Sequence, residues 1–388
     1  MHKTHIKLLR ENLIITMLSY LMMAFFLLML SFRAFDPLSN ALKSFSFTDI
    51  YYQILSQTSA PDTSRVVTIV DMTNIYRRGE MAKLFEDIQA ANPRVVGVDV
   101  VFDAEKDDWE GNDSLIHVAQ TYSNMFFSVK YLDFDEKKGE FTKETHSFFS
   151  KYTDIKEGFC NVPRGGQYDM TKRNVFRRCK SNGKTKPSLV SQVASAYCGK
   201  NLWKDGKEEM QVNFSPMEFK VLTPTDVKKH PELIRDRIVM VGAMYEDTDF
   251  HWTPVGKIAG VRLLSYAVQT FLEKKDVKVI PEYMTCITSF FITLLICYFI
   301  RAYQKRTNAS KNLFIKFLIG SSYVMSIFMF FITSILLCIS FLIFTLTNIT
   351  VNLAWAISSI AFITTSSNLY KAIKEYYDHR RATVTASS

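Results

Sequence analysis

The chain has 388 residues and a net charge of +9, from 47 Lys and Arg against 38 Asp and Glu. Its apolar residues are concentrated near the N-terminus and in the last hundred residues, which excludes a purely soluble protein and indicates an integral membrane protein. The excess positive charge lies beside the apolar segments, so it gives no support to nucleic-acid binding.

Four segments are predicted to cross the membrane. The first is 12–32, read as an uncleaved anchor because Ser31-Phe-Arg-Ala-Phe offers no small-residue cleavage site. The second is 283–300. The 54 uncharged residues between Lys316 and Lys371 are too many for one crossing, so two further spans are predicted at 317–337 and 349–370. None of the four contains an ionisable residue, which argues against a transporter or channel.

The distribution of basic residues predicts the orientation. The N-terminal segment 1–11 carries three Lys or Arg and one acid, the loop 301–316 five and none, and the tail 371–388 four and two. Together these segments account for the whole net charge, so the region between the first two spans is neutral. We therefore expect both termini on the cytoplasmic side of the membrane, with the lipid bilayer as a partner and the large domain on the opposite side.

The external region is predicted to be a linker, 33–64, followed by an α/β domain, 65–282. Its first half alternates between buried strands and amphipathic helices: strands at Arg65–Asp71, Val95–Phe102 and Met125–Val129, and helices at Gly79–Ala91 and Asp113–Thr121. Such alternation is typical of right-handed βαβ units, so we expect a mostly parallel sheet with helices on both faces.

The second half begins with an insertion, 130–157, which is charged and predicted to be irregular. The remaining predicted strands are Gly158–Val162, Val175–Lys180, Met210–Phe214 and Arg237–Ala243, and the remaining helices are Ser188–Tyr197 and Gly260–Leu272.

Three carboxylates follow predicted parallel strands. Asp71 and Asp99 end the first two strands, and Asp103 lies four residues further on. Ligands of open α/β sheets bind beyond the carboxyl ends of the strands, so these residues are candidates for binding a polar ligand or a cation. The alternative is that they cap helices or bind loop amides.

A second group, Asp249, His251 and Thr253, follows the last buried strand and should lie at the same edge of the sheet. Asp-x-His could contact a ligand, hold a metal or act as an acid–base couple. However, Thr253-Pro254 is typical of a tight turn whose polar side chains bind their own backbone, which leaves a purely structural interpretation open.

A local basic cluster lies inside the neutral domain. It consists of Lys172, Arg173, Arg177, Arg178, Lys180, Lys184 and Lys186. It could bind anionic head groups or sugars, or it could be a solvated hairpin.

Three cysteines fall in the external domain, where disulfides are permitted, and an odd number leaves one thiol over. Cys160 with Cys179 is the preferred pair, because both are predicted strand residues that flank a loop. No Cys/His spacing indicates zinc, and no metal or other cofactor is expected.

Several blocks of the domain resemble the CHASE2 family in the order that the family has them. They are Val66–Asp71 with Val95–Phe102, then Gly158-Phe-Cys-Asn161 with Arg177-Arg178 and the helix from Ser188, then Ile238–Ala243 with Asp249–Pro254 and Ala259-Gly-Val261. The resemblance implies an extracytoplasmic sensory domain between one span and three closing spans. It further implies a bacterial inner membrane, with this domain in the periplasm. It also raises Arg177 and Arg178 above their basic neighbours as candidate ligand contacts.

CHASE2 domains usually precede a cytoplasmic kinase or cyclase, whereas only Lys371–Ser388 follows the last predicted span here. Eighteen residues cannot form a folded catalytic domain. We therefore expect a non-catalytic sensor that binds an unknown extracytoplasmic ligand and passes the signal to a separate membrane or cytoplasmic protein.

Two alternatives stay open. One is a structural or assembly subunit of an envelope complex, and the other is a metal-dependent hydrolase built on Asp71, Asp99, Asp249 and His251. Self-association of the chain is also left open.

Overall fold

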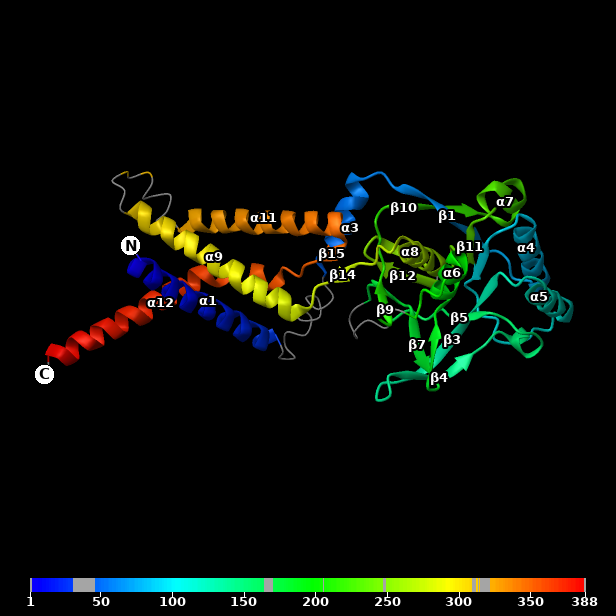
Figure 1. Cartoon of the computed structure of the whole chain (residues 1–388), viewed down its shortest axis with the longest axis horizontal. Helices are drawn as coiled ribbons and strands as arrows, with labels where there is room; N and C mark the ends of the chain where they lie inside the picture. Colours follow the sequence, from blue (N-terminus) through cyan, green and yellow to red (C-terminus); the bar gives the residue numbers. More distant parts are fainter. Residues whose placement is uncertain are drawn as a thin grey trace. The chain divides into compact units, whose positions relative to one another are not determined.

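The structure is a computed structural model, and it describes residues 2–30, 46–163, 170–204, 206–246, 249–308, 312, 314 and 322–386. The chain divides into two compact units (Figure 1). The membrane unit consists of Met1–Phe47 and Lys278–Ser388, and the external unit is Thr48–Val277. Residues 33–45 of the predicted linker and 317–321 of the predicted third span lie outside the described residues.

A nine-stranded, mostly parallel sheet forms the centre of the external unit, as predicted. Eight of the strands are hydrogen-bonded in the order β10-β1-β11-β2-β3-β4-β7-β8, and the ninth, β5, pairs with β3 outside this order. The parallel part contains β1 (Asp62–Asp71), β2 (Val95–Val98), β3 (Met125–Asp135), β5 (Glu157–Phe159), β10 (Met217–Leu222) and β11 (Ile238–Gly242). The antiparallel pairs, β3–β4 and β7–β8, bring in β4 (Glu140–Thr145), β7 (Arg178–Ser181) and β8 (Lys184–Pro187).

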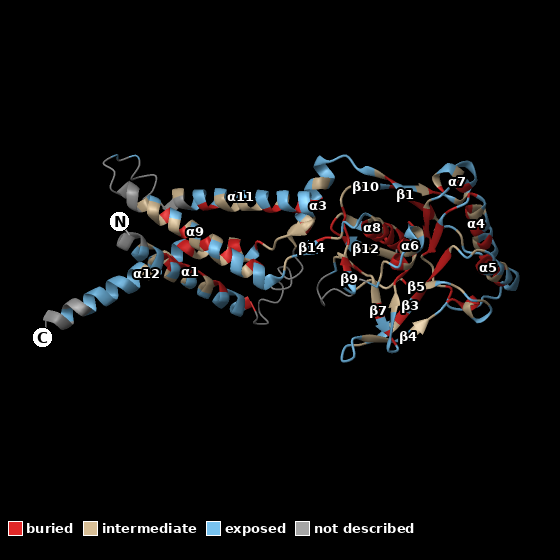
Figure 2. Ribbon diagram, viewed as in Figure 1, coloured by how far each residue is buried: buried red, intermediate tan, exposed pale blue. Residues whose placement is uncertain are grey.

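Helices cover both faces of the parallel strands, which explains why these strands read as continuous apolar runs. All residues of β2 and β11 are buried (Figure 2). One face packs against α4 (Arg78–Ala90), α5 (Trp109–Thr121) and α7 (Pro224–Lys229), and the other against α6 (Leu189–Cys198) and α8 (Gly260–Glu273).

Local sequence signals set the limits of α6. The Ser188 side chain accepts a hydrogen bond from the Ser191 amide at 3.2 Å, which satisfies one free N–H of the first turn. The helix ends where Gly199 takes a left-handed conformation with φ of 64°.

The predicted insertion 130–157 is more regular than expected. Strand β3 continues to Asp135 and forms an antiparallel hairpin with β4, and a 3₁₀ turn, η2 (Phe148–Lys151), follows. The prediction of an irregular segment was wrong because the hairpin is only half-buried, so its charged side chains obscure the alternation.

Smaller elements complete the external unit. The helix α3 (Phe47–Thr58) lies at its start, and Arg173 pairs with Asp49 on this helix through Nε at 2.9 Å. Two short antiparallel ribbons are formed by β6 (Asn174–Phe176) with β9 (Glu209–Gln211) and by β12 (Phe250–Thr253) with β13 (Gly256–Ala259). A further 3₁₀ turn, η3, spans Pro231–Leu233.

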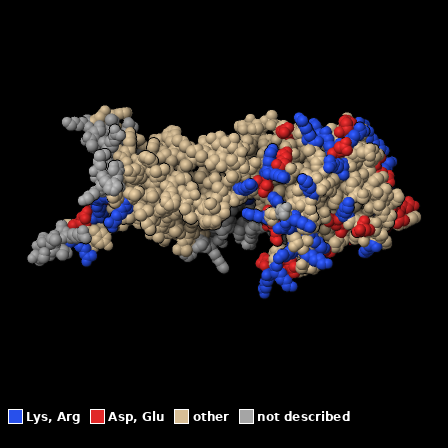
Figure 3. Space-filling model, viewed as in Figure 1, with Lys and Arg blue, Asp and Glu red and all other residues tan. Residues whose placement is uncertain are grey.

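In the described part of the membrane unit there are four long helices: α1 (His2–Leu30), α9 (Glu282–Asn308), α11 (Ser322–Thr347) and α12 (Ala354–Ala386). Its core includes Ile15 of α1, Cys297 of α9, Met329 of α11 and Ile360 of α12. Figure 3 shows charged side chains of both signs over the external unit and a wide uncharged surface on the membrane unit.

The prediction of four membrane spans was wrong. Among the described residues, three helices are long and apolar enough to cross a membrane: Ile6–Leu30, Glu282–Gln304 and Ser326–Thr347. The last of these lies further along the chain than the predicted 317–337. The predicted fourth span, 349–370, begins in β15 (Ile349–Thr350), and its helix starts only at Ala354 and carries the polar run Thr364-Thr-Ser-Ser-Asn368.

Nevertheless, α12 packs inside the membrane unit. Its Ser359 hydroxyl lies 2.7 Å from the Thr293 hydroxyl of α9, and Lys374 Nζ lies 3.2 Å from Glu11 Oε1 of α1. The strand β15, just before α12, pairs with β14 (Lys278–Val279), just before α9. Consequently, α12 begins near the start of α9 and reaches the end of the bundle that holds Glu11.

Candidate functional site

The parallel strands bring their carboxyl ends to one edge of the sheet, as predicted. Asp71 of β1 is in register with Gly242 of β11, and Val241 is in register with Val98 of β2, which Asp99 follows. This edge is where open α/β sheets bind ligands.

The Asp71 carboxylate is hydrogen-bonded to backbone amides of the protein itself. Its Oδ1 accepts hydrogen bonds from the amides of Thr73 at 2.9 Å and Met244 at 3.0 Å, and from the Thr73 hydroxyl. That hydroxyl also accepts the Tyr245 amide at 3.1 Å. Asp71 and Thr73 thus join the loops that follow β1 and β11, and these contacts favour the loop-binding interpretation of Asp71.

Asp99 differs from Asp71 in its surroundings. Its amide donates to the Val241 carbonyl at 2.7 Å, whereas among the described residues nothing forms a hydrogen bond or ion pair with its carboxylate. Burial, with a further contribution from the charge of Asp249, raises the pKa of Asp99 to about 7. A half-buried carboxylate with no donor is suited to receive a proton or an external donor.

Asp249 lies at the N-terminus of α8. Its carboxylate accepts the Gly260 amide, and a Cβ at Gly260 would lie 2.6 Å from Asp249 Oδ2, so a larger residue at this position would displace the carboxylate. Burial and the charge of Glu246 raise the pKa of Asp249 to about 6, against the opposing effect of the Gly260 hydrogen bond. The Asp249 carboxylate therefore binds the start of α8, and its charge also acts on Asp99.

His251 lies next to this pair, with Nε2 3.8 Å from Asp249 Oδ1. Burial and the charge of Lys172 lower the pKa of His251, so a neutral imidazole is favoured beside the two carboxylates. Thr253 has a structural contact instead: its hydroxyl donates to the Gly256 carbonyl at 2.7 Å across the β12–β13 turn.

The structure therefore brings Asp99, Asp249 and His251 together, and we refer to these three residues as the sheet-edge site. Asp103 is not part of it. This residue is exposed, and its charge acts on the buried guanidinium of Arg78, which lies 4.4 Å from the Phe148 ring centroid.

Arg177 and Arg178 also make contacts within the domain. The Arg177 guanidinium lies 3.1 Å from Asp276 Oδ2 and 5.0 Å from the Phe271 ring centroid. Arg178 donates to the carbonyls of Trp203 at 3.0 Å and Gly206 at 2.8 Å, and to that of Lys204. These contacts account for both residues structurally, and their role in ligand binding stays a prediction.

Cys160 and Cys179 are both free thiols in the structure, so the predicted disulfide is not formed in it. The Cys160 thiol lies 3.8 Å from the Val129 carbonyl, and burial, followed by the charge of Asp99, raises its pKa to about 12. Cys179 is buried beside Phe159. Cys160 thus lies close to the sheet-edge site as a protonated thiol.

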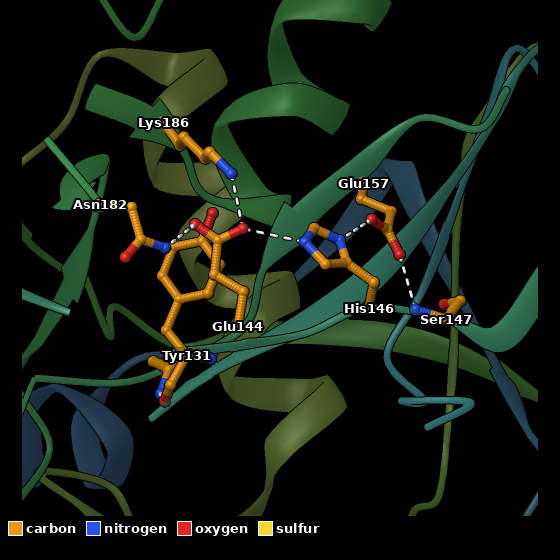
Figure 4. A network of polar contacts seen from close by, with 8 residues as sticks. Tyr131, Glu144, His146, Ser147, Glu157, Asn182 and Lys186 are labelled. Carbon is orange, nitrogen blue, oxygen red and sulfur yellow. Dashed lines mark hydrogen bonds and ion pairs between the residues drawn. The ribbon is translucent and has the colours of Figure 1, made fainter. Parts of the chain in front are cut away.

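Sequence reasoning missed a polar network on the β3–β4 hairpin. There, His146 contacts the carboxylates of both Glu144 and Glu157, and Lys186 binds Glu144 (Figure 4). The available signal was Glu144-Thr-His146, two ionisable residues on one face of a strand. It was hidden within a segment that was interpreted as irregular.

Comparison with known proteins defines the family. The CHASE2 domain model matches residues 15–298, which extend from α1 through the external unit into α9, and no curated protein or solved structure matches the chain. Within the described residues, no group of three or more His, Cys, Asp or Glu could hold a metal ion, so the structure gives no support to the hydrolase alternative. The chain belongs to the CHASE2 family, whose members carry extracytoplasmic sensory domains that are generally non-catalytic.

Proposed function

We propose that this protein is a non-catalytic membrane sensor: it binds a ligand at the sheet-edge site and passes the signal to a separate partner protein. The observation that carries the proposal is the position of Asp249. Its carboxylate is electrostatically coupled to Asp99, which has no hydrogen-bond donor among the described residues, and it accepts a hydrogen bond from Gly260, where α8 begins. A change of charge at the site therefore acts directly on a helix terminus.

The route from the site towards the membrane follows the chain. Helix α8 ends at Glu273, and after residues 274–281 the span helix α9 begins at Glu282. Val277, within this connection, is buried, and its amide donates to the Gln211 carbonyl at 3.3 Å. Asp276 in the same connection pairs with Arg177. Because the connection is short, a shift of α8 is expected to reach α9.

The side chains at the carboxyl-end edge of the sheet indicate which class of ligand the site would bind. Asp99 and Asp249 are acceptors, and exposed aromatic rings stand on the loops after β1 and β11: Tyr76 is 72% and Tyr245 70% exposed. Carboxylates together with exposed aromatic faces favour an organic cation, through charge and cation–π contacts. A ligand can shift the domain only if it binds one arrangement better than the other.

The same proposal includes the topology. We propose that the N-terminus and the 301–316 loop are cytoplasmic, because they carry the basic residues. Since Lys374 pairs with Glu11, the C-terminal half of α12 belongs to the same side. The exposed end of α12 is then available on that side for the partner protein, in a bacterial inner membrane.

Thermal unfolding of the full-length protein in lipid nanodiscs tests ligand binding, with a panel of organic amines as probes. We expect one class of amine to raise the unfolding temperature of the wild type and of the Asp103→Asn control, and to leave Asp99→Asn and Asp249→Asn unshifted. An equal shift in all four proteins would place binding elsewhere and contradict the proposed site.

A further inference from the structure

A histidine between two carboxylates lies outside the sheet-edge site. His146 Nε2 lies 2.9 Å from Glu144 Oε2 of β4, and Nδ1 contacts Glu157 Oε2 of β5 (Figure 4). Both strands pair with β3, β4 antiparallel and β5 parallel. The imidazole thus connects side chains of two strands, β4 and β5, and we call this arrangement the His146 bridge.

The bridge depends on a proton. A neutral imidazole has one N–H and can donate from only one nitrogen, whereas an ionised carboxylate can only accept. Both contacts are therefore satisfied only when His146 is an imidazolium. The carboxylate side chains are 8% and 12% exposed, but the ring is 43% exposed, so external protons reach it directly.

Neither carboxylate is left alone when the imidazole loses its proton. Glu144 Oε2 lies 2.6 Å from Lys186 Nζ, and Glu157 Oε1 accepts the Ser147 amide at 2.8 Å. Each carboxylate thus keeps another partner when the imidazole turns away into water. A second arrangement would therefore bury no unpaired charge, as a two-state element requires.

Charged side chains from the neighbouring strands surround the bridge. His146 faces Glu144 from β4 and Glu157 from β5; Lys186 from β8 lies against Glu144 and 5.9 Å from the ring centroid of Tyr131 of β3. Burial acts to raise the pKa of Glu144, but hydrogen bonds and the charge of Lys186 outweigh it and hold that pKa below its usual value.

The sign of the pH dependence follows. A carboxylate with a lowered pKa contributes stability above its ordinary titration range and loses this contribution as the pH falls. The contribution of the imidazolium is lost when the ring gives up its proton, because a neutral imidazole cannot donate to both carboxylates. The bridge is therefore closed in mildly acidic conditions and opens towards alkaline pH.

The bridge is connected to the sheet-edge site through β5. This strand runs from Glu157 to Phe159, and Cys160 follows, where its thiol lies near the charge of Asp99. A Cβ at Gly158 would lie 2.5 Å from the Leu189 Cα, so β5 packs directly against the start of α6. A displacement of Glu157 is therefore transmitted to both Cys160 and α6.

We propose that the external unit senses the proton concentration through the His146 bridge, whose opening shifts β5 beside Asp99. This inference rests on the proposed sensory function and names a stimulus for it.

Hydrogen exchange of the full-length protein in nanodiscs, at about pH 5.5 and about pH 8 and corrected for intrinsic rates, tests the inference. For wild type, we expect the protection of residues 140–157 to fall about tenfold at the higher pH, since the loss of one hydrogen bond to a charged group is an effect of about this size. His146→Gln should show the low protection at both pH values, and His146→Arg, which stays charged, the high protection at both.

The matched control is His117→Gln, which changes an exposed histidine of α5 and should keep the wild-type response. Equal protection of the wild type at both pH values, or a wild-type response in His146→Gln, would overturn the inference. Residues 260–273, recorded in the same experiment, report separately on α8. A failed bridge is thereby distinguished from a failed sheet-edge site, which the Asp249→Asn variant tests.

Discussion

Asp99 is the residue whose chemistry departs most from its ordinary behaviour at the sheet edge. Its pKa is raised to about 7, so the folded protein prefers the protonated form. A raised carboxyl pKa favours folding below the unfolded value, and the advantage is lost as the pH rises through the folded value. The cost of the charged carboxylate is thus largest above pH 7.

Replacement of this carboxylate should stabilise the protein at high pH. We expect Asp99→Asn to raise the free energy of unfolding by on the order of 1 to 4 kcal/mol near pH 8 and by less near pH 5. Denaturant unfolding at the two pH values measures the difference. A loss of stability at pH 8 would show that the charged form makes favourable contacts.

Thr73 permits a second test at the same scale, because its hydroxyl joins two loops. Thr73→Val keeps the shape but removes the acceptor of the Met244 and Tyr245 amides and the donor to Asp71. We expect a loss of about 1 to 3 kcal/mol in the free energy of unfolding. Thr121→Val on α5, where the hydroxyl only bonds its own helix, is the control and should change stability little.

The sequence predicted which residues lie at the sheet edge but not what each of them does. Asp71 and Asp99 were placed correctly because buried parallel strands carry recognisable apolar runs whose ends meet. Their different roles depend on the Met244 amide, which is 173 residues from Asp71 in the chain. Likewise, no local pattern shows that Arg178 binds the carbonyls of Trp203 and Gly206.

At the scale of elements, the contact of β11 with α8 depends on a glycine. A Cβ at Gly242 would lie 2.8 Å from Val261 Cβ and 3.3 Å from Asp99 Cβ. We therefore expect Gly242→Ala to lower the free energy of unfolding by about 1 to 3 kcal/mol through overpacking and to disturb ligand binding.

Gly79→Ala is the matched control for this substitution. Gly79 lies in the first turn of α4, and an added Cβ meets nothing within 4 Å. The higher helix propensity of alanine should leave stability unchanged or raise it by up to about 1 kcal/mol. Equal effects of the two alanines would show that α8 does not pack against β11 as described.

The two elements that were predicted incorrectly failed for different physical reasons. The β3–β4 hairpin has too many charged side chains for a clear period of two, and the predicted fourth span was inferred from an absence of charge alone. In α12, hydroxyl and amide side chains lower the mean hydropathy, and buried Ser359 bonds Thr293 of α9. Packing against other helices, which local sequence does not reveal, stabilises this segment.

At the scale of the whole molecule, a membrane sensor must connect an external site with its spans. The chain offers α8 for this purpose, since α8 starts at Gly260, whose amide binds the Asp249 carboxylate, and its chain leads on to α9. If a separate protein receives the signal, it should co-purify with the full-length chain in mild detergent, and truncation after Tyr370 should abolish the association. Retention of the partner by the truncated chain would move its binding surface away from the exposed end of α12.

The most direct test of the proposed route is hydrogen exchange of full-length Asp249→Asn in nanodiscs, with Asp103→Asn as the control. Loss of the carboxylate at the start of α8 removes a favourable helix-terminus interaction. We predict faster exchange in the first turns of α8, from Gly260, together with altered exchange in the first turns of α9, from Glu282, and no change in the control. A change confined to α8, with exchange in α9 as in the wild type, would contradict transmission from the sheet-edge site to the membrane spans.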